Sequence, residues 1–407
     1  MADLVYFNVP YYGHIDPTLG LVQELVKRGE KIDYYCTEEF RHRIELAGAR
    51  FQPLPSQLDP MSFLTMESYG METCLELLPI LSEQLQRDQP KLLIFESSCL
   101  LGALLGKLLQ LTTVSTHTIT FVPPGFSLPM SELLAYTLPP RWFPFLSALH
   151  PISEGSIVEK LQWFYHHRRL WTQLRQQYPT EGVKLNEMLR LQGDLNIVFL
   201  SEALPIKREL FNESYIFTGP CYLDIPPDPD FPLGDIEGES VIYISLGTFY
   251  NQNISFFKKC LLAFGQSNYR VVMTIGKSLK IEQLGEIPLN FIVRNWVPQL
   301  EILKHARLFI THGGQNGVLG GLMHRVPLVV FPQGADQFFL ASRVQELGAG
   351  MWLKNKNFKP MELRQIAENV MNNPDIRENL EQLGNSFVEA GGVGKAADKI
   401  LKFKNRL

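Results

Sequence analysis

Short apolar runs alternate with helical patterns through the first half of the chain. The runs are rich in Leu, Ile, Val, Tyr and Phe, and they predict buried strands at 4–9, 31–36, 91–95 and 113–116. The helical patterns between them cover 17–28, 38–47 and 100–110. Strands that alternate with helices in this way predict a parallel sheet with helices on both faces.

The alternation restarts after a Pro-rich segment. Apolar runs predict strands at 240–246, 269–275, 291–294, 308–311 and 328–331, and helical patterns lie near 254–266, 337–347 and 377–403. The predicted fold class is therefore α/β, with two Rossmann-like domains and a ligand cleft between them at the carboxyl ends of both parallel sheets. We assign the domains to 1–215 and 239–385 with a linker at 216–238, and expect the C-terminal helix of 386–407 to pack back toward the first domain.

Composition restricts the class of protein. The chain has 407 residues, 45% of them apolar, and a net charge of −4, which is typical of a globular protein and gives no basic footprint for nucleic acid. The longest apolar run, 99–111, is too short to span a bilayer, so we expect no stable membrane insertion. Five cysteines without CxxC spacing argue against disulfides and zinc, and predict a cytoplasmic location. The basic run 166–169 predicts a solvated helix face, with contact to an anionic partner as the alternative.

Two titratable residues follow predicted strands of the first half. His14 comes after the first strand, at the sheet edge where ligands bind, and a neutral imidazole there can take a proton from a hydroxyl. The alternative is a histidine that only bonds the turn. Asp16 and Pro17 predict the N-cap and the first residue of the following helix. Glu96 ends the strand of 92–95; its carboxylate can hold the tautomer of His14 or, alternatively, simply lie at a helix N-terminus.

Glycine-rich turns follow two predicted strands of the second half. The strand of 308–311 breaks into glycines and continues as a helix, whose first backbone N–H groups are unpaired and suit a phosphate or pyrophosphate. Another strand ends at Ser245 and Thr248, whose hydroxyl and N–H groups suit phosphate oxygens. This half therefore predicts a nucleotide-sugar site.

Further side chains with suitable chemistry follow neighbouring strands. Trp296 is held by a Pro turn and can stack on a base, while Gln299 can reach ribose or the base edge. Asp336 and Gln337 offer acceptors and donors to sugar hydroxyls, although Asp336 is equally suited to cap the helix that follows.

Motifs of other enzyme classes are missing from the sequence. It has no Gly-x-Ser-x-Gly elbow, no Walker loop and no Gly-x-Gly-x-x-Gly after the first strand, which argues against a hydrolase, an NTPase and a dehydrogenase. Asp228 and Asp230 have the spacing of a metal-binding Asp-x-Asp motif but lie in the linker. We therefore expect no metal and no cofactor.

The order of these motifs resembles the family 1 glycosyltransferases of GT-B fold, in particular the bacterial macrolide glycosyltransferases. The resemblance covers essentially the whole chain and rests on Gly13-His14, Ser245–Thr248, Trp296–Gln299, His312–Asn316, Val326-Pro327-Leu328 and Pro332-Gln333 with Asp336-Gln337. It implies an inverting, metal-independent transfer of a hexose, glucose in the first instance, from a UDP-sugar to an acceptor hydroxyl.

The resemblance also implies roles for individual residues. His14 would be the general base, and Glu96 stands where the family usually has an Asp that partners this histidine. Trp296 would stack on uracil, the Val297 backbone would pair with the base edge, and Gln299 would hold ribose. Asp336 and Gln337 would contact the donor sugar. The diphosphate would be held by the glycine-rich turns, through Ser245, Gly247, Thr248, His312, Gly314, Asn316 and Gly317.

Three positions depart from the family pattern. Gly317 stands where Ser or Thr is usual. Gly320 stands where a Glu usually holds the ribose hydroxyls, and losing those hydrogen bonds would cost roughly 1.5–3 kcal/mol of nucleotide affinity. Arg325 replaces a glycine that the family places before Val-Pro, which predicts a positive φ at this residue.

The predicted acceptor loops at 60–80 and 118–165 are rich in Met and aromatic residues. Such side chains suit an apolar small molecule such as a macrolide, a phenolic or a flavonoid, although packing beneath a helical lid explains them equally well. The acceptor candidates are Met61, Phe63, Met66, His117, Phe121 and Met130.

Two other functions are open on the sequence. The first is a catalytically impaired nucleotide-sugar-binding or accessory protein, which the departures at Gly317, Gly320 and Arg325 favour. The second is a GT-B enzyme of another class, such as a UDP-sugar 2-epimerase or a lipid-linked sugar transferase. We expect a monomer or a homodimer.

Overall fold

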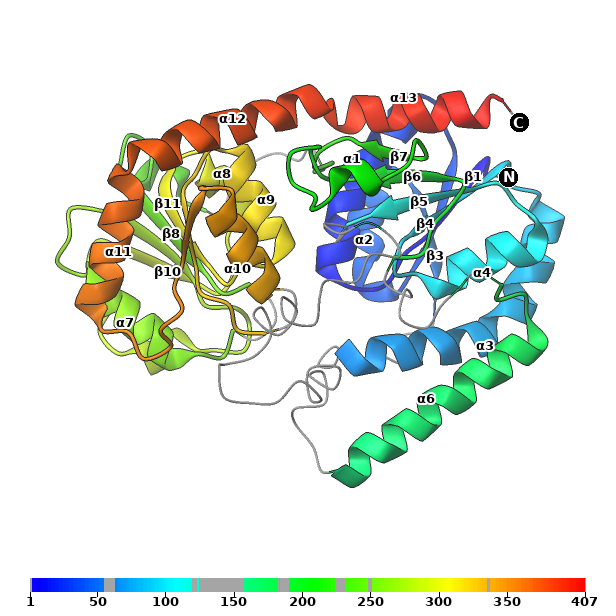
Figure 1. The fold of residues 1–407 in the computed structure, drawn as a ribbon, viewed down its shortest axis with the longest axis horizontal. Helices are drawn as coiled ribbons and strands as arrows, with labels where there is room; N and C mark the ends of the chain where they lie inside the picture. Colours follow the sequence, from blue (N-terminus) through cyan, green and yellow to red (C-terminus); the bar gives the residue numbers. More distant parts are fainter. Residues whose placement is uncertain are drawn as a thin grey trace. The chain divides into compact units, whose positions relative to one another are not determined.

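The fold is described from a computed structural model. It describes residues 2–54, 63–118, 123, 157–181, 183, 190–223, 231–247, 251–334 and 337–406, and for 63–69 and 157–164 it describes the backbone only. These residues form two compact units, each with one parallel sheet (Figure 1). The first unit holds the described residues of 2–123, 157–223 and 386–406, and the second holds those of 231–385.

The first unit has a seven-stranded sheet in the order β3-β2-β1-β4-β5-β6-β7. Its strands are β1 (Leu4–Phe7), β2 (Ile32–Cys36), β3 (Arg50–Pro53), β4 (Leu92–Glu96), β5 (Thr113–His117), β6 (Leu195–Val198) and β7 (Tyr215–Phe217). Its helices are α1 (Tyr12–Lys27), α2 (Arg41–Leu46), α3 (Phe63–Asp88), α4 (Leu100–Leu109), α6 (Ile157–Gln177) and α13 (Gly392–Lys404), with 3-10 helices at Glu38–Phe40 and Arg208–Leu210.

Both faces of this sheet are buried, because successive strand residues point to opposite sides. Leu4 and Tyr6 of β1 pack in a core with residues of α1, α2 and α13, whereas Val5 and Phe7 pack in a second core with residues of α3, α4 and α6. The sequence patterns of short apolar runs reflect this two-sided burial.

The second unit has a six-stranded sheet in the order β10-β9-β8-β11-β12-β13. Its strands are β8 (Val241–Ser245), β9 (Arg270–Thr274), β10 (Phe291–Arg294), β11 (Ala306–Thr311), β12 (Leu328–Val330) and β13 (Gly350–Trp352). Its helices are α7 (Ile254–Phe264), α8 (Gln299–Leu303), α9 (Gln315–Met323), α10 (Gln337–Glu346) and α11 (Pro360–Asn372), with 3-10 helices at Leu233–Asp235 and Ile281–Leu284, and α12 (Pro374–Ala390) continues from this unit into the first.

The α/β fold class predicted from the sequence is confirmed, with differences at individual elements. The predicted helix of 377–403 is two helices, because Gly391 adopts a left-handed φ of 87° between α12 and α13. Strand β7 includes Ile216 and Phe217, so the sheet extends into the segment expected to be a linker. Strands β3, β6, β7 and β13 were not predicted. Within the described ranges, no helix is both long and apolar enough to cross a membrane.

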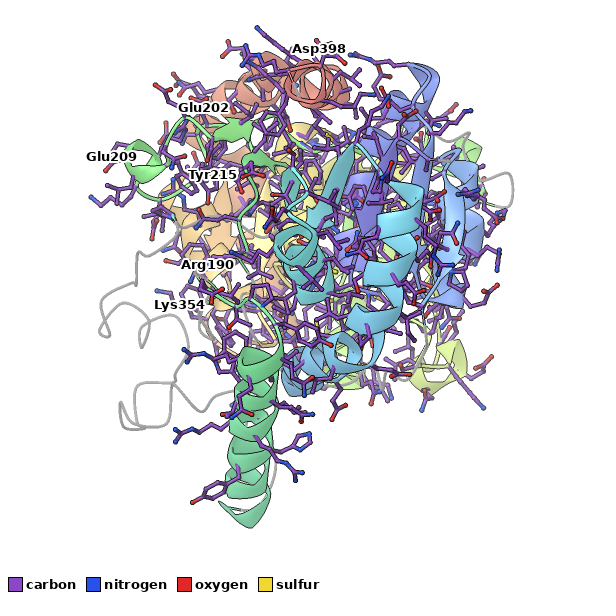
Figure 2. All side chains as sticks on the ribbon, turned by 90° about the vertical axis from the view of Figure 1, so that its right-hand side faces the viewer. Arg190, Glu202, Glu209, Tyr215, Lys354 and Asp398 are labelled. Atoms are coloured by element: carbon purple, nitrogen blue, oxygen red, sulfur yellow. The ribbon has the colours of Figure 1, made fainter. Side chains whose placement is uncertain are left out.

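The C-terminal helix α13 packs against α1, the helix that carries His14 (Figure 1). Lys404 bonds Glu30 at 2.5 Å, and Arg28 pairs with Asp398, which lies on the outer side of α13 (Figure 2). The chain at Cys221 and Tyr222 also approaches α1 closely, and the Cys221 carbonyl accepts a bond from Gly20 N at 3.2 Å. Helix α1 is therefore contacted by two segments that are distant from it in the sequence.

We expect Gly20→Ala to destabilise the first unit strongly. A Cβ at this position would lie 2.2 Å from the Tyr222 carbonyl oxygen, and the backbone there can move away only at a large cost in free energy. We expect a loss of roughly 3 kcal/mol in the free energy of unfolding, at the upper end of the range for overpacking. Urea unfolding followed by circular dichroism measures it.

Gly70→Ala in α3 is the matched control. Its Cβ would lie 4.0 Å from its nearest neighbour, so the usual preference of a helix for Ala should leave stability equal or higher by up to about 1 kcal/mol. Equal stability of the two variants would show that the contact at Gly20 is not tight.

Candidate active site

Each sheet brings its candidate residues to the point where the strand order reverses. In the first unit β4 lies directly beside β1, and in the second β11 lies directly beside β8. At such a switch point the loops after the two strands diverge and leave space at the carboxyl edge, which is where ligands bind in doubly wound folds. His14 and Glu96 follow one such pair of strands, and Gly247 and His312 follow the other.

His14 lies in the first turn of α1 and contacts Glu96. Its Nδ1 is 3.1 Å from Glu96 Oε2, and its side chain is 14% exposed while that of Glu96 is fully buried. The helix starts earlier than predicted, because the Tyr11 carbonyl accepts bonds from His14 N and Ile15 N. The predicted capping role of Asp16 is therefore wrong; this carboxylate instead bonds Arg43 Nη1 at 2.6 Å.

Several donors surround the carboxylate of Glu96. Oε1 accepts bonds from Ser97 Oγ at 3.0 Å and Thr118 Oγ1 at 2.8 Å, and Oε2 accepts one from Ser98 N at 2.8 Å. Burial alone raises the pKa of this carboxyl, but the charge of His14 and these hydrogen bonds outweigh it and lower the pKa to about 2. An ionised carboxylate accepts a hydrogen bond from the Nδ1–H group of His14, which leaves the lone pair of the neutral ring on Nε2.

His117 does not fit the predicted role in acceptor binding. It is the last residue of β5 rather than a residue beyond the strand, and it is fully buried. Its Nε2 lies 3.1 Å from Asn196 Oδ1, its ring packs 5.6 Å from that of Tyr215, and burial lowers its pKa to about 4 (Tyr215 is labelled in Figure 2). It is a neutral core histidine.

The other acceptor candidates cannot be placed. Met61, Phe121 and Met130 lie outside the described residues. Phe63 and Met66 belong to α3, but only their backbone is described.

In the second unit the ring of His312 lies between two glycines. A Cβ on Gly247 would come within 2.4 Å of its Cε1, and a Cβ on Gly314 within 2.4 Å of its Nε2. Gly247 also has a φ of 75°, which side chains rarely adopt. Burial lowers the pKa of His312 to about 4, although a hydrogen bond with the Ser245 backbone acts to raise it. The ring is therefore a neutral hydrogen-bonding group at neutral pH.

The helix after His312 offers backbone donors. Helix α9 begins at Gln315 with Gly314 as its N-cap, and no side chain caps it. Asn316 and Gly317 lie in its first turn, where N–H groups have no partner within the helix. The dipole of the helix adds positive potential at this end, so the turn suits an anion.

The remaining donor candidates of this unit follow β10 and β12. Trp296 is 53% exposed, whereas Val297 next to it is buried, so much of the indole is accessible to a ligand. Gln299 opens α8, and its Nε2 lies 3.7 Å from the position of a Cβ on Gly320. Gln337 uses its Oε1 to accept bonds from Gln333 N and Gly334 N, so it also holds its own turn.

Two predicted residues of this group, Thr248 and Asp336, lie outside the described residues. Ser245 is buried, and its Oγ accepts a bond from Gly247 N at 3.2 Å, so it shapes the turn.

Sequence reasoning missed two residues that shape these turns. Asn251 donates to the Gly247 carbonyl at 2.8 Å and occupies the space that a Cβ on Gly276 would take. Thr118 contacts both Glu96 and His14. Its position directly after β5, next to the strand that ends in Glu96, was the available signal.

Comparisons with known proteins agree on one family. Residues 258–391 match the family model described as the C-terminal domain of erythromycin biosynthesis protein CIII-like proteins. The chain is 33% identical to YojK, an uncharacterized UDP-glucosyltransferase of Bacillus subtilis, over 99% of this chain and 97% of that one. It is 26% identical to oleandomycin glycosyltransferase of Streptomyces antibioticus, over 98% and 90% of the two chains. The crystal structure of the kitacinnamycin glycosyltransferase superimposes with a TM-score of 0.81 at 26% identity, covering 98% of both chains.

The chain belongs to the family 1 glycosyltransferases of GT-B fold. It is an enzyme of the macrolide and natural-product type, and its co-substrate is a nucleotide sugar.

The glycosyltransferase keeps the predicted conformation at one of its family departures. Arg325 has a φ of 58°, as predicted from the glycine that the family has there. Its guanidinium bonds Glu381 at 2.8 Å and Asn385 at 2.7 Å on α12. At Gly320 the space for a side chain is restricted, because a Cβ would lie 3.0 Å from Leu303 Cδ1.

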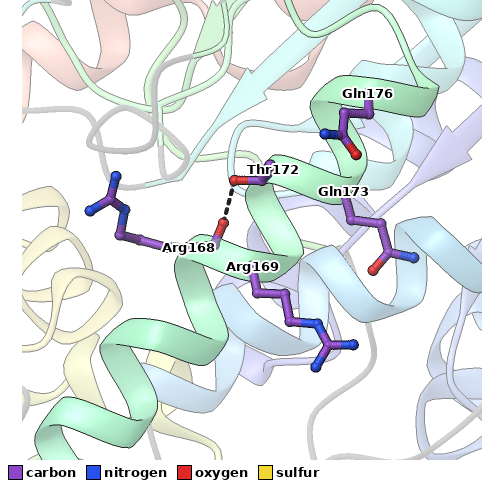
Figure 3. Close-up of a pocket in the computed structure, with 5 residues that line it drawn as sticks. All are labelled: Arg168, Arg169, Thr172, Gln173 and Gln176. Atoms are coloured by element: carbon purple, nitrogen blue, oxygen red, sulfur yellow. Dashed lines mark hydrogen bonds between the residues drawn. The ribbon is translucent and has the colours of Figure 1, made fainter.

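The glycosyltransferase also has a shallow surface pocket on α6 (Figure 3). Arg168 and Arg169 line it and are exposed, in agreement with the solvated helix face predicted from the basic run, whereas His167 is buried. Thr172 Oγ1 donates to the Arg168 carbonyl at 2.8 Å, an ordinary bond within a helix. This pocket is lined by one helix and contains none of the candidate site residues.

We expect Gly314→Ala to weaken nucleotide binding. Its Cβ would displace the His312 ring from the turn, and loss of one hydrogen bond to a charged phosphate costs about 1.5–3 kcal/mol, roughly a tenfold to hundredfold loss of affinity. Isothermal titration with UDP measures this. Gly234→Ala, whose Cβ would meet no atom within 4 Å, should bind like the wild type. Unchanged affinity in Gly314→Ala would exclude the His312 turn from the nucleotide site.

We expect His117 to make the stability of the first unit depend on pH. The folded state binds a proton at this ring only near pH 4, whereas the unfolded state binds it near pH 6.5, so His117 lowers the free energy of unfolding as the pH falls through this window. The stability advantage of the wild type over His117→Gln should therefore shrink from about pH 7 to about pH 4.5. Urea unfolding at a series of pH values tests this; a constant difference would contradict it.

Proposed function

We propose that the enzyme transfers glucose from UDP-glucose to a hydroxyl of an apolar small-molecule acceptor, with inversion at the anomeric carbon and His14 as the general base. The observation that carries the proposal is the contact of His14 with the buried, ionised carboxylate of Glu96. A carboxylate bonded to Nδ1 orients the ring, leaves Nε2 free to accept a proton, and stabilises the imidazolium that forms.

The reaction is a single displacement. The acceptor O–H gives its proton to His14 Nε2 while the oxygen forms a bond to the anomeric carbon. The bond from that carbon to the β-phosphate oxygen breaks, and UDP leaves with the electron pair. Attack from the face opposite to UDP inverts the configuration of the sugar.

The second unit supplies groups for the leaving nucleotide. The first-turn N–H groups of α9 and the neutral ring of His312 suit the charge that develops on the diphosphate. The exposed indole of Trp296 suits the uracil ring, and the amide of Gln299 suits the ribose hydroxyls. Together they provide charge stabilisation without a metal ion.

The names of two relatives and two segments of the sequence support the donor and the acceptor class. The relative from Bacillus subtilis is named a UDP-glucosyltransferase, and the relative from Streptomyces antibioticus is named for the macrolide oleandomycin. The Met-rich and aromatic segments of 60–80 and 118–165 suit an apolar acceptor, such as a macrolide, a phenolic or a flavonoid.

A nucleotide-sugar-binding protein with little turnover is the second candidate. The observation in its favour is Gly320, which offers no carboxylate to ribose and whose side-chain space is restricted by Leu303. This candidate predicts UDP binding without transfer.

We expect His14→Ala to reduce acceptor-dependent release of UDP from UDP-glucose by about 10²–10⁴-fold, the usual contribution of a general base. Glu96→Gln should cause a loss of similar order, because its amide donates to Nδ1 and favours the wrong tautomer. A panel of macrolide, phenolic and flavonoid acceptors serves as substrate, and proton NMR of the product reports the anomeric configuration.

His42→Ala is the matched control, since His42 is an exposed histidine of the same unit and should retain full activity. UDP affinity of His14→Ala should equal that of the wild type. Activity that survives in His14→Ala would exclude it as the base, and UDP binding without transfer by the wild type would favour the second candidate.

A further inference from the structure

Thr118 lies beside the His14–Glu96 pair on a third strand. It is the first residue after β5, and β5 pairs with β4 so that Thr116 is opposite Glu96. Strand β4 lies between β1 and β5, so the carboxylate of Glu96 is reached both by His14, which follows β1, and by Thr118, which follows β5. The Thr118 side chain is 1% exposed.

The direction of the hydrogen bonds around Thr118 follows from its single proton. Oγ1 lies 2.8 Å from Glu96 Oε1 and 3.3 Å from His14 Nδ1. An ionised carboxylate can only accept, so the hydroxyl proton goes to Glu96. The oxygen then presents only lone pairs to His14, and Nδ1 must carry the proton between them.

Two acceptors therefore face Nδ1 of His14. Glu96 Oε2 lies 3.1 Å from it and Thr118 Oγ1 lies 3.3 Å from it. With the proton held on Nδ1, the lone pair of the neutral ring is confined to Nε2, the nitrogen that a base needs.

Thr118 also limits rotation of the carboxylate. The other donors to Glu96 apart from His14 are Ser97 Oγ and Ser98 N, which directly follow it in the chain and move with the end of β4. Thr118 is a donor from the neighbouring strand and ties Oε1 to the end of β5. This tie is useful for a glutamate, because its side chain has one more rotatable bond than that of aspartate.

We propose that Thr118 is a positioning residue that sets the tautomer of His14 and the orientation of Glu96. The proposal rests on the function of His14 as the base, but its first readout needs neither substrate nor turnover. A merely structural Thr118 would stabilise the end of β5 without affecting the tautomer of His14.

The experiment compares three variants by NMR of ¹⁵N-histidine-labelled protein at about pH 8.5, where histidines are neutral. The His14 signals are assigned by their absence in His14→Gln. We expect a proton on Nδ1 in the wild type and a mixture of both tautomers in Thr118→Val, which keeps the shape but loses the hydroxyl. Thr118→Ser should restore the wild-type signals.

Thr116→Val is the matched control. Thr116 is a buried threonine of the same strand, and its hydroxyl bonds Tyr6 at 2.6 Å rather than the pair. Its loss should lower stability but leave the tautomer of His14 unchanged.

Kinetics supply the second readout. Thr118→Val should lower kcat about tenfold, the order expected for one hydrogen bond, with an unchanged KM for the UDP-sugar, and Thr118→Ser should recover most of kcat. If Thr118→Val does not fold, Thr118→Ala removes the same hydroxyl without adding a second methyl group.

A wild-type tautomer in Thr118→Val or Thr118→Ala would overturn the proposal, as would a shift that Thr118→Ser fails to reverse. If the wild type transfers no sugar, the proposed function fails, but the NMR comparison still decides whether Thr118 sets the tautomer.

Discussion

A negative charge buried at the end of a strand is the constraint on which the first unit depends. An isolated carboxylate in a protein interior costs several kcal/mol, so Glu96 is tolerated only if its environment supplies donors. Those donors come from the residues that follow β4, from the residue that follows β5 and from the first turn of α1. The loops at the carboxyl edge are thus organised around one charge, and His14 owes its orientation to that charge.

The described part of the candidate site in the second unit is built from neutral groups. His312 is kept neutral by burial, and the start of α9 has backbone donors without a capping side chain. The first-turn N–H groups have no partner within the helix, so this turn suits the oxygens of an anion such as a diphosphate. Glycines at 247 and 314 are needed because a Cβ at either position would collide with the imidazole. One unit holds a buried charge in place and the other presents backbone donors at the start of a helix, and a transfer from an anionic donor would use both.

The sequence predicted the parts of this fold that are built from long patterns. Apolar runs bounded by helical patterns identified the central strands, and the order of strands and glycine-rich turns identified His14, Glu96 and His312 as candidates. Strands β3, β6, β7 and β13 were missed because each is only three or four residues long and lies at or near a sheet edge. The start of α1 was misplaced because Asp16 and Pro17 are strong local signals, yet Asp16 is held by Arg43, a residue distant in the sequence. His117 was expected to face the acceptor because it is polar. The sequence does not reveal that Asn196, which is distant along the chain, forms a hydrogen bond with it in the core.

The departures from the family pattern differ in what they change. A left-handed conformation costs a side-chain-bearing residue roughly 1–2 kcal/mol, and at Arg325 the bonds to Glu381 and Asn385 offset part of that cost. This substitution therefore concerns stability and the attachment of α12. Gly317 leaves the phosphate donors intact, because the backbone N–H groups of α9 do not depend on the side chain. Only Gly320 removes a side chain to which the family assigns a ligand contact, and that contact is with ribose. The expected consequence is looser nucleotide binding with the His14–Glu96 pair intact, because these two residues belong to the other unit.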